Sequence, residues 1–201
     1  MNPELAFQIT FFVLVFGLLL IRSLSAREVR RAGESNLPSR QAIQREGIGI
    51  FAGRVILFLF LVTLIVLYAL NPPWLSIFHI PLPDWLRWLG AALGVVSLVL
   101  WGWTQYSLGK YWSTNLQLRQ DHRLVTNGPY AQVRHPLYTA MMGYGTSMAL
   151  VSAQWGFLLM ALLMIVGVIF RAPKEEQMMI GQFGEEYRQY MQRTGRFLPK
   201  M

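Results

Sequence analysis

The sequence predicts an all-α fold, a polytopic membrane bundle of about five transmembrane helices followed by a C-terminal amphipathic helix. Hydrophobic residues make up 54% of the 201 residues and charged residues only 14%, whereas a soluble domain carries about 25% charged residues. The apolar residues form long continuous blocks rather than recurring at helix or strand spacing. The basic residues gather in segments that separate these blocks. Together these features indicate an integral membrane protein.

The apolar blocks give the number of spans. Leu5–Ile21, Ile48–Leu70 and Trp85–Leu108 each approach the roughly 20 residues that a spanning helix needs. The block Leu137–Phe170 is longer, and as one helix, at ~1.5 Å per residue, it would far exceed the ~30 Å hydrocarbon core. Because Ser152-Ala153-Gln154 interrupts it, we predict two short helices in a tight hairpin, which makes five spans.

The first block has an alternative interpretation as a cleaved signal peptide, because Ser23-Leu24-Ser25-Ala26 loosely resembles a cleavage site. However, the preceding Met-Asn-Pro-Glu carries no positive charge, and the apolar run exceeds the ~7–15 residues usual for a signal peptide. Arginines also follow it directly. We therefore predict a retained span.

The distribution of basic residues predicts the orientation. Segments 22–47, 107–136 and 171–201 hold six, four and six Lys or Arg residues, whereas the N-terminus, loop 71–84 and the hairpin tip hold none. With five spans, the three basic segments lie on one side of the membrane. The positive-inside rule makes that side cytoplasmic, which places the N-terminus outside and the C-terminus in the cytoplasm.

The composition also excludes several classes of function. The net charge of +8 follows the membrane topology, so we expect no nucleic-acid partner. The absence of cysteine excludes disulfides, thiolate metal sites and a cysteine nucleophile. His79, His122 and His135 show no close ligand spacing, and we predict no metal site. No glycine-rich loop follows a strand, so a Rossmann-type site is not indicated.

Residues 109–136 differ from the other loops and suggest one wall of a site. The segment contains Gly109-Lys110-Tyr111-Trp112-Ser113 and the turn signal Asn127-Gly128-Pro129-Tyr130. It has aromatic residues and cations but no long helical stripe. Non-helical backbone near a membrane must be buried in protein or face water, which favours a ligand site here.

Two polar clusters flank the predicted hairpin. One comprises Tyr130, Arg134, His135 and Tyr138, and the other comprises Arg171, Glu175 and Glu176. The two ends of a hairpin lie on the same face, so we expect the clusters to meet. Arg171 and Glu175 are four residues apart and can share a helix face if Pro173 does not distort it. Such residues also occur at membrane interfaces for structural reasons, so the residues alone predict only a polar ligand site at the cytoplasmic mouth of the bundle.

The predicted C-terminal helix carries an apolar stripe. Met179, Phe183, Tyr187 and Tyr190 recur at intervals of four, four and three residues, which is typical of one amphipathic helix. Pro173 either occupies the first turn of this segment or kinks the fifth span. We expect the stripe to pack on the membrane surface or on the core.

Four ordered motifs resemble those of the isoprenylcysteine carboxyl methyltransferase and phospholipid methyltransferase superfamily. The similarity is closest to its small prokaryotic five-span members and covers roughly residues 107–200. Residues 1–106 then form N-terminal spans and residues 107–201 a catalytic region. The motifs are Gly128-Pro129-Tyr130-Ala131-Gln132-Val133-Arg134-His135-Pro136-Leu137-Tyr138, Arg171-Ala172-Pro173-Lys174-Glu175-Glu176, Phe183-Gly184-Glu185-Glu186-Tyr187-Arg188-Gln189-Tyr190 and Arg196-Phe197-Leu198-Pro199.

This resemblance implies an S-adenosylmethionine-dependent methyltransferase. Its acceptor would be a lipophilic carboxylate, amine or thiol that enters laterally from membrane lipids, and the implied location is a prokaryotic inner membrane. Arg171 would orient an anionic acceptor. Thr139-Ala140 departs from the small residue and glycine of many relatives, which bears on close backbone packing. The implied cofactor-site residues are Trp112, Gly128, Pro129, Tyr130, His135, Tyr138, Glu175 and Glu176.

Three alternatives remain at this point. Membrane sterol reductases share an Arg-His-Pro-x-Tyr motif and bind NADPH, but they are longer, and Leu137 and Thr139-Ala140 depart from their continuation. A non-catalytic membrane scaffold could keep the same fold. A phospholipid N-methyltransferase would belong to the same enzyme class.

Overall fold

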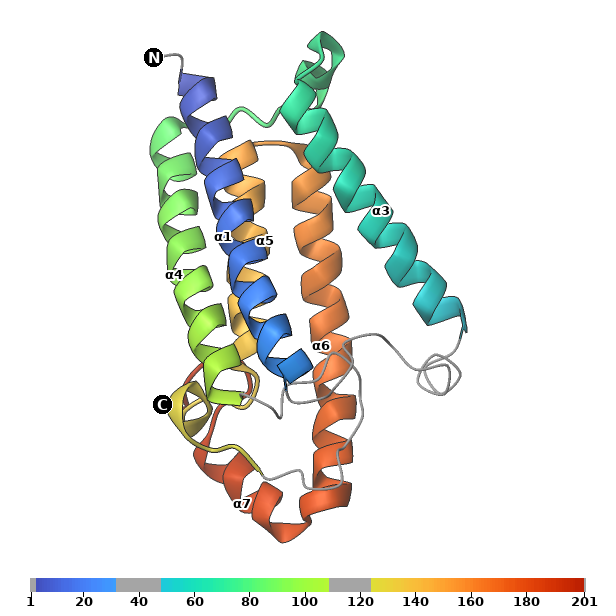
Figure 1. The fold of residues 1–201 in the computed structure, drawn as a ribbon, viewed down its shortest axis with the longest axis vertical. Helices are drawn as coiled ribbons and strands as arrows, with labels where there is room; N and C mark the ends of the chain where they lie inside the picture. The colour runs from blue at the N-terminus through green and yellow to red at the C-terminus, as the bar shows by residue number, and fades with distance from the viewer. Residues whose placement is uncertain (1–2, 32–47, 109–123, 201) are drawn as a thin grey trace.

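The computed structural model describes residues 3–31, 48–108 and 124–200 (Figure 1). These residues are almost entirely helical and contain no β-strand apart from two isolated bridges, which confirms the predicted all-α membrane fold. The α-helices are α1 (Pro3–Arg31), α3 (Ile48–Leu70), α4 (Asp84–Leu108), α5 (Pro136–Ser152), α6 (Trp155–Phe183) and α7 (Glu185–Arg193), with short 3-10 helices η1 (Pro73–Phe78) and η3 (Gly128–Ala131).

Within the described residues, α1, α3, α4 and α6 are each long and apolar enough to cross a membrane. The predicted fourth span, α5, has only 17 residues and therefore a length of about 25 Å. It forms the expected hairpin with α6. The turn is built on Ala153, whose backbone is left-handed at φ 50°, and its carbonyl accepts a hydrogen bond from Ile80 at 2.7 Å. The loop after α3 thereby holds the hairpin tip.

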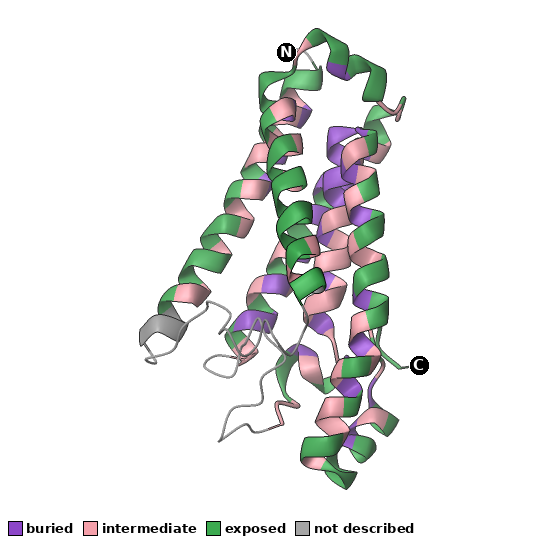
Figure 2. Cartoon of the chain, turned by 90° about the vertical axis from the view of Figure 1, so that its right-hand side faces the viewer, coloured by how far each residue is buried: buried purple, intermediate pink, exposed green. Residues whose placement is uncertain are grey.

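Small residues let α4 and α5 approach closely. A Cβ atom on Gly94 would lie 2.4 Å from Ser147 Oγ, and one on Gly143 would lie 2.4 Å from Ser97 Oγ. Close backbone approach at small residues is a main source of helix association in membranes. Figure 2 shows that the buried residues gather where the helices pack against one another, whereas α3 is mostly exposed. The N-terminal end of α3 diverges from α6 (Figure 1).

An ion pair between a buried arginine and an exposed glutamate fastens the end of the bundle that carries the N-terminus. Arg87 in α4 is only 1% exposed. Its Nη1 and Nη2 donate to the two carboxylate oxygens of Glu4 in α1 at 2.6 and 3.0 Å, and its Nε and Nη2 donate to the Val151 carbonyl of α5 at 3.2 and 3.0 Å. The guanidinium also lies 3.8 Å from the centre of the Phe7 ring. This arrangement ties α1, α4 and α5 together.

The C-terminal region differs from the prediction of one continuous amphipathic stripe. Helix α6 runs through Pro173 and ends at Phe183, where Gly184 adopts a left-handed φ of 54° and separates α6 from α7. Met179 and Phe183 therefore belong to α6, while Tyr187 and Tyr190 belong to α7 and are buried. The prediction of a single stripe was wrong because the residues after Gly184 turn back toward the bundle (Figure 1).

Candidate functional site

The two predicted polar clusters meet at the open end of the α5–α6 hairpin. This end of the bundle lies opposite the N-terminus and next to α7 (Figure 1). Helix α5 begins there at Pro136, and α6 extends beyond its apolar part with residues 171–183. At 29 residues, α6 is roughly 44 Å long, longer than the ~30 Å core of a bilayer. Its polar end can therefore project beyond the hydrocarbon and carry charged side chains.

Glu175 is the centre of the first group of contacts. Its Oε1 accepts hydrogen bonds from Tyr138 Oη at 2.5 Å and from Arg171 Nε at 2.8 Å. His135 Nδ1 lies 3.7 Å from Glu175 Oε2, and the His135 ring stacks on Tyr138 with centroids 5.3 Å apart. The predicted meeting of the clusters and the predicted Arg171–Glu175 pair are both confirmed. The Glu175 side chain is 22% exposed, so it remains accessible.

Glu176 has different surroundings. Its Oε1 accepts from Arg134 Nε at 2.9 Å and from Arg196 Nε at 3.1 Å, and its Oε2 accepts from Arg196 Nη2 at 2.6 Å. The Glu176 side chain is only 4% exposed. Hydrogen bonding to this carboxylate raises the pKa of Arg196. A buried carboxylate requires such partners, and here they come from two different segments of the chain.

Residues 194–198, which we name the C-terminal strap, lie beside the segment that leads into α5. Arg134 N–H donates to the Gly195 carbonyl at 2.8 Å, and His135 N–H donates to the Arg196 carbonyl at 3.0 Å. In return, Gly195 N–H donates to the Gln132 carbonyl at 3.0 Å. Thr139 Oγ1 donates to the Phe197 carbonyl at 2.5 Å. The strap thus forms a short parallel pairing against one side of the candidate site.

The turn Gly128–Tyr130 packs between α4 and α7. Gly128 has a left-handed φ of 57°, and a Cβ atom there would lie 2.7 Å from Ser107 Oγ, so this position requires glycine. The Tyr130 carbonyl accepts a hydrogen bond from Tyr190 Oη at 2.6 Å. Burial raises the pKa of Tyr190 to about 12, which keeps this hydroxyl protonated as a donor. The turn is therefore fixed in place.

Two arginines take part in the cluster although they were not predicted site residues. Arg134 belonged to the first sequence cluster but was given no role, and Arg196 was quoted only as part of a motif. Arg134 Nη1 also donates to the carbonyls of Met191, at 3.1 Å, and Thr194. The available signal was charge balance, because two adjacent acids near the end of a membrane helix call for nearby cations. Trp112 lies outside the described residues.

The arrangement suits a ligand that carries ammonium or hydroxyl groups. His135 Nε2 is buried and has no hydrogen-bond partner among the described residues, its nearest carboxylate oxygen being Glu176 Oε1 at 3.5 Å. Such an orphaned group invites an additional partner. The accessible Glu175 carboxylate can accept from an ammonium group or from hydroxyls, and the stacked His135 and Tyr138 rings offer aromatic faces.

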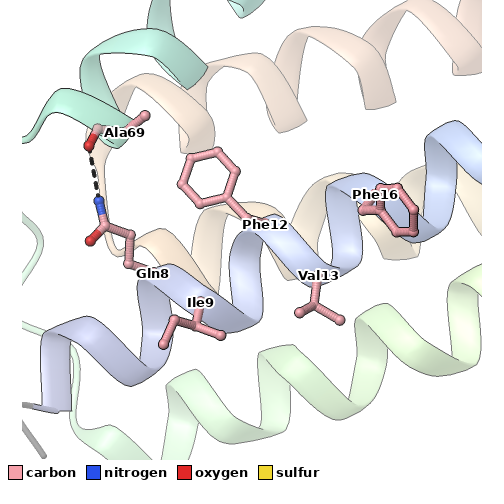
Figure 3. A pocket seen from close by; sticks show the side chains of 6 residues that line it. All are labelled: Gln8, Ile9, Phe12, Val13, Phe16 and Ala69. Carbon is pink, nitrogen blue, oxygen red and sulfur yellow. Dashed lines mark hydrogen bonds between the residues drawn. The ribbon is translucent and has the colours of Figure 1, made fainter.

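A second surface feature is an apolar groove between α1 and α3, far along the bundle from these clusters. It is lined by Gln8, Ile9, Phe12, Val13, Phe16 and Ala69. Figure 3 shows Gln8 reaching the Ala69 carbonyl at one end of the groove, and this side chain donates to the carbonyls of Tyr68 and Ala69 at 2.8 and 3.3 Å. None of the predicted site residues lines it, so it is separate from the candidate site.

Comparisons with known proteins agree with this architecture. Residues 88–181 match the model of the Isoprenylcysteine carboxyl methyltransferase (ICMT) family. The structure of the eukaryotic intramembrane Ras methyltransferase ICMT superposes with a TM-score of 0.66 and 21% identity, covering 99% of this chain and 68% of that chain. At this identity the superposition establishes the fold.

Two curated bacterial proteins are also similar. The uncharacterized protein YpbQ of Bacillus subtilis (strain 168) is 26% identical over 135 residues, which cover 65% of this chain and 73% of YpbQ. The nickel-cobalt-cadmium resistance protein NccN of Alcaligenes xylosoxydans xylosoxydans is 29% identical over 119 residues, 57% of this chain. The matched region spans about half of NccN, 53% of its length.

The helices form an integral membrane bundle with the fold of the intramembrane methyltransferase ICMT. Residues 88–181, just under half of the chain, match the ICMT family model, and the resemblance identified from the sequence motifs is confirmed. Family and fold together support a membrane methyltransferase.

Proposed function

We propose that this protein transfers a methyl group from S-adenosylmethionine to a lipophilic acceptor at the cytoplasmic end of the bundle. The observation that carries the proposal is the convergence of Tyr138, Arg171 and His135 on the accessible carboxylate of Glu175. In this proposal, residues 107–201 form the catalytic region and residues 1–106 supply membrane spans. The protein resides in a prokaryotic inner membrane, with its N-terminus outside and its C-terminus in the cytoplasm.

The donor site would be formed by the open end of the α5–α6 hairpin and by the adjacent turn Gly128–Tyr130. Glu175 accepts hydrogen bonds from the donor's ammonium or hydroxyl groups, and His135 Nε2, which makes no hydrogen bond to a described residue, supplies a further polar contact. Tyr138 and the backbone of Gly128–Tyr130 shape the site, and Trp112 remains a predicted aromatic contact. When bound, S-adenosylmethionine supplies a methyl group on a sulfonium, which aromatic faces attract.

The acceptor would be lipophilic and would enter sideways from the bilayer. Arg171 lies 27% exposed beside Glu175, where its guanidinium can orient an anionic group such as a carboxylate. A carboxylate acceptor needs no general base, because it is already deprotonated at neutral pH. The residues then contribute chiefly alignment, which can lower a barrier by about 7–11 kcal/mol. Amine and thiol acceptors remain within the proposal.

Equilibrium binding with the purified protein tests the donor assignment. Labelled S-adenosylmethionine should bind saturably in detergent, and NADPH, the cofactor of the reductase alternative, should not displace it. Incubation of membrane extracts with isotopically labelled donor, followed by mass spectrometry, should then reveal a methylated lipophilic product. Saturable NADPH binding without S-adenosylmethionine binding would favour the reductase, and binding of neither cofactor would favour the scaffold.

A further inference from the structure

The two adjacent acids of α6 differ in how many of their acceptor positions remain open. A carboxylate offers about four lone-pair positions. In Glu176, three are occupied by the guanidiniums of Arg134 and Arg196, and the side chain is 4% exposed. Glu175 lies about 100° further round the helix and is 22% exposed. Glu176 therefore has little capacity for an external ligand, whereas Glu175 retains some.

We infer that Glu176 is a positioning residue that holds the C-terminal strap against the donor site, and that Arg196 is its partner in this role. The inference rests on the proposed function and assigns different roles to the two acids. Of the two, only Glu175 would contact the donor. It revises the sequence-based expectation that both acids hold the donor's polar groups.

The contacts of Glu176 link three parts of the chain. Arg134 precedes α5, Glu176 lies on α6, and Arg196 belongs to the strap. Arg134 also binds the carbonyls of Met191 and Thr194 at the end of α7. The carboxylate thus neutralises part of the charge of two guanidiniums at the point where these segments meet. Removal of Glu176 would leave the largely buried Arg134 guanidinium without its carboxylate, which is strongly unfavourable.

His135 connects this cluster to the donor. Its backbone N–H donates to the Arg196 carbonyl at 3.0 Å, and its ring lies between Glu175 and Glu176, 3.7 and 3.5 Å from their oxygens. A shift of the strap therefore moves the backbone that places the His135 ring. Arg196 itself is 42% exposed and can be substituted with less disturbance to packing than a core residue. Its effect on donor binding would pass through Glu176 and His135.

The test compares three arginine variants of the full chain. Arg196→Gln should raise the donor dissociation constant roughly tenfold or more, while the KM for a lipophilic acceptor stays within about twofold. Arg196→Lys keeps the charge and should restore most of the donor affinity. Arg188→Gln on the exposed face of α7 makes the same chemical change away from the cluster and should have no effect.

The strap itself provides a second test that does not depend on Arg196. Thr139→Val removes the hydrogen bond from Thr139 Oγ1 to the Phe197 carbonyl and leaves the ion cluster intact. It should also weaken donor binding, by a smaller factor. This variant keeps the inference testable if Arg196→Gln fails to fold.

The outcomes separate the inference from the proposed function. If the unmodified protein binds no S-adenosylmethionine, the proposed function fails and the inference fails with it. If the unmodified protein binds donor but Arg196→Gln and Thr139→Val both bind it equally well, only the inference is overturned. An equal rise of donor and acceptor constants in Arg196→Gln, with a lower melting temperature and no rescue by lysine, would also overturn it, because that pattern indicates general destabilisation.

Discussion

Glu175 combines accessibility with firm placement, since Tyr138 and Arg171 both donate to its Oε1. Glu175→Gln keeps the shape but removes the charge, and a charge-assisted hydrogen bond is roughly twice as strong as a neutral one. We expect a loss of about 1.5–3 kcal/mol in donor binding, or roughly 10- to 150-fold in affinity. Equilibrium binding of labelled S-adenosylmethionine measures this change.

The matched control for this substitution is Glu185→Gln, which alters an exposed acid in the first turn of α7. It should leave donor affinity unchanged, because surface charges contribute little to a distant site. If Glu175→Gln also left affinity within about twofold, the donor site would have to lie elsewhere.

The residues of the cluster were predictable from their types and order, but their pairing was not. Sequence spacing placed Arg171 and Glu175 on one helix face, and the hairpin brought Tyr138 to them. Arg196 reaches Glu176 only because the chain reverses after Gly184 and the strap pairs with residues 132–135. No local pattern encodes that return. The pairing of Glu176 with two guanidiniums therefore depends on the tertiary structure.

At the scale of helices, long apolar blocks were sufficient to predict α1, α3, α4 and the α5–α6 hairpin. The sequence indicates the packing of α4 on α5 less clearly. The signal is a pair of glycines, Gly90 and Gly94, four residues apart within an apolar helix. This spacing often indicates a close helix contact, and the structure places a Cβ on Gly90 only 2.5 Å from Leu150 Cβ. Hydropathy alone does not predict which helix packs against these glycines.

The tight α4–α5 contact predicts a difference between two glycine substitutions. In Gly94→Ala, the new methyl group would lie 2.4 Å from Ser147 Oγ and 2.8 Å from Leu14 Cδ1, both on buried residues. Overpacking of this kind lowers the stability of the fold by about 1–3 kcal/mol, whereas the higher helix propensity of alanine raises it by about 1 kcal/mol. Thermal unfolding in detergent should therefore show an unchanged or lower midpoint, never a higher one.

Gly167→Ala is the control, because nothing lies within 4 Å of a Cβ at Gly167 in α6. Here only the helix preference acts, and the midpoint should rise slightly or stay the same. A Gly94→Ala protein more stable than the Gly167→Ala protein would contradict the close contact of α4 with α5.

Across the whole molecule, two ion clusters hold opposite ends of one bundle. Glu176 organises the end that carries the candidate site, and the Glu4–Arg87 pair fastens the other end. The second cluster escaped prediction because its charges lie far apart in sequence. Arg87 falls inside an apolar block and Glu4 just before one, and each is unremarkable alone. Only the packing of α1 on α4 brings them together.

This ion pair predicts non-additive effects on stability. Glu4→Gln leaves the Arg87 guanidinium, 1% exposed, without its carboxylate, and we expect a loss of about 1.5–3 kcal/mol. The double variant Glu4→Gln with Arg87→Met removes both charges and should lose less than the single variant, since it leaves no buried charge without a partner. Comparing the unfolding midpoints of both variants in detergent tests the coupling, and strictly additive losses would speak against it.

The orientation of the bundle can be tested because the chain contains no cysteine. Ile77 in η1 is 79% exposed at the end that carries the N-terminus, and Glu185 in α7 is exposed at the opposite end (Figure 1). The three basic segments should remain in the cytoplasm because translocation of short, positively charged loops is disfavoured. In intact cells, a membrane-impermeant maleimide should therefore label Ile77→Cys, whereas it should label Glu185→Cys only after the membrane is opened. Labelling of both positions from one side would contradict the bundle's transmembrane arrangement, and the reverse pattern would contradict the orientation derived from the charges.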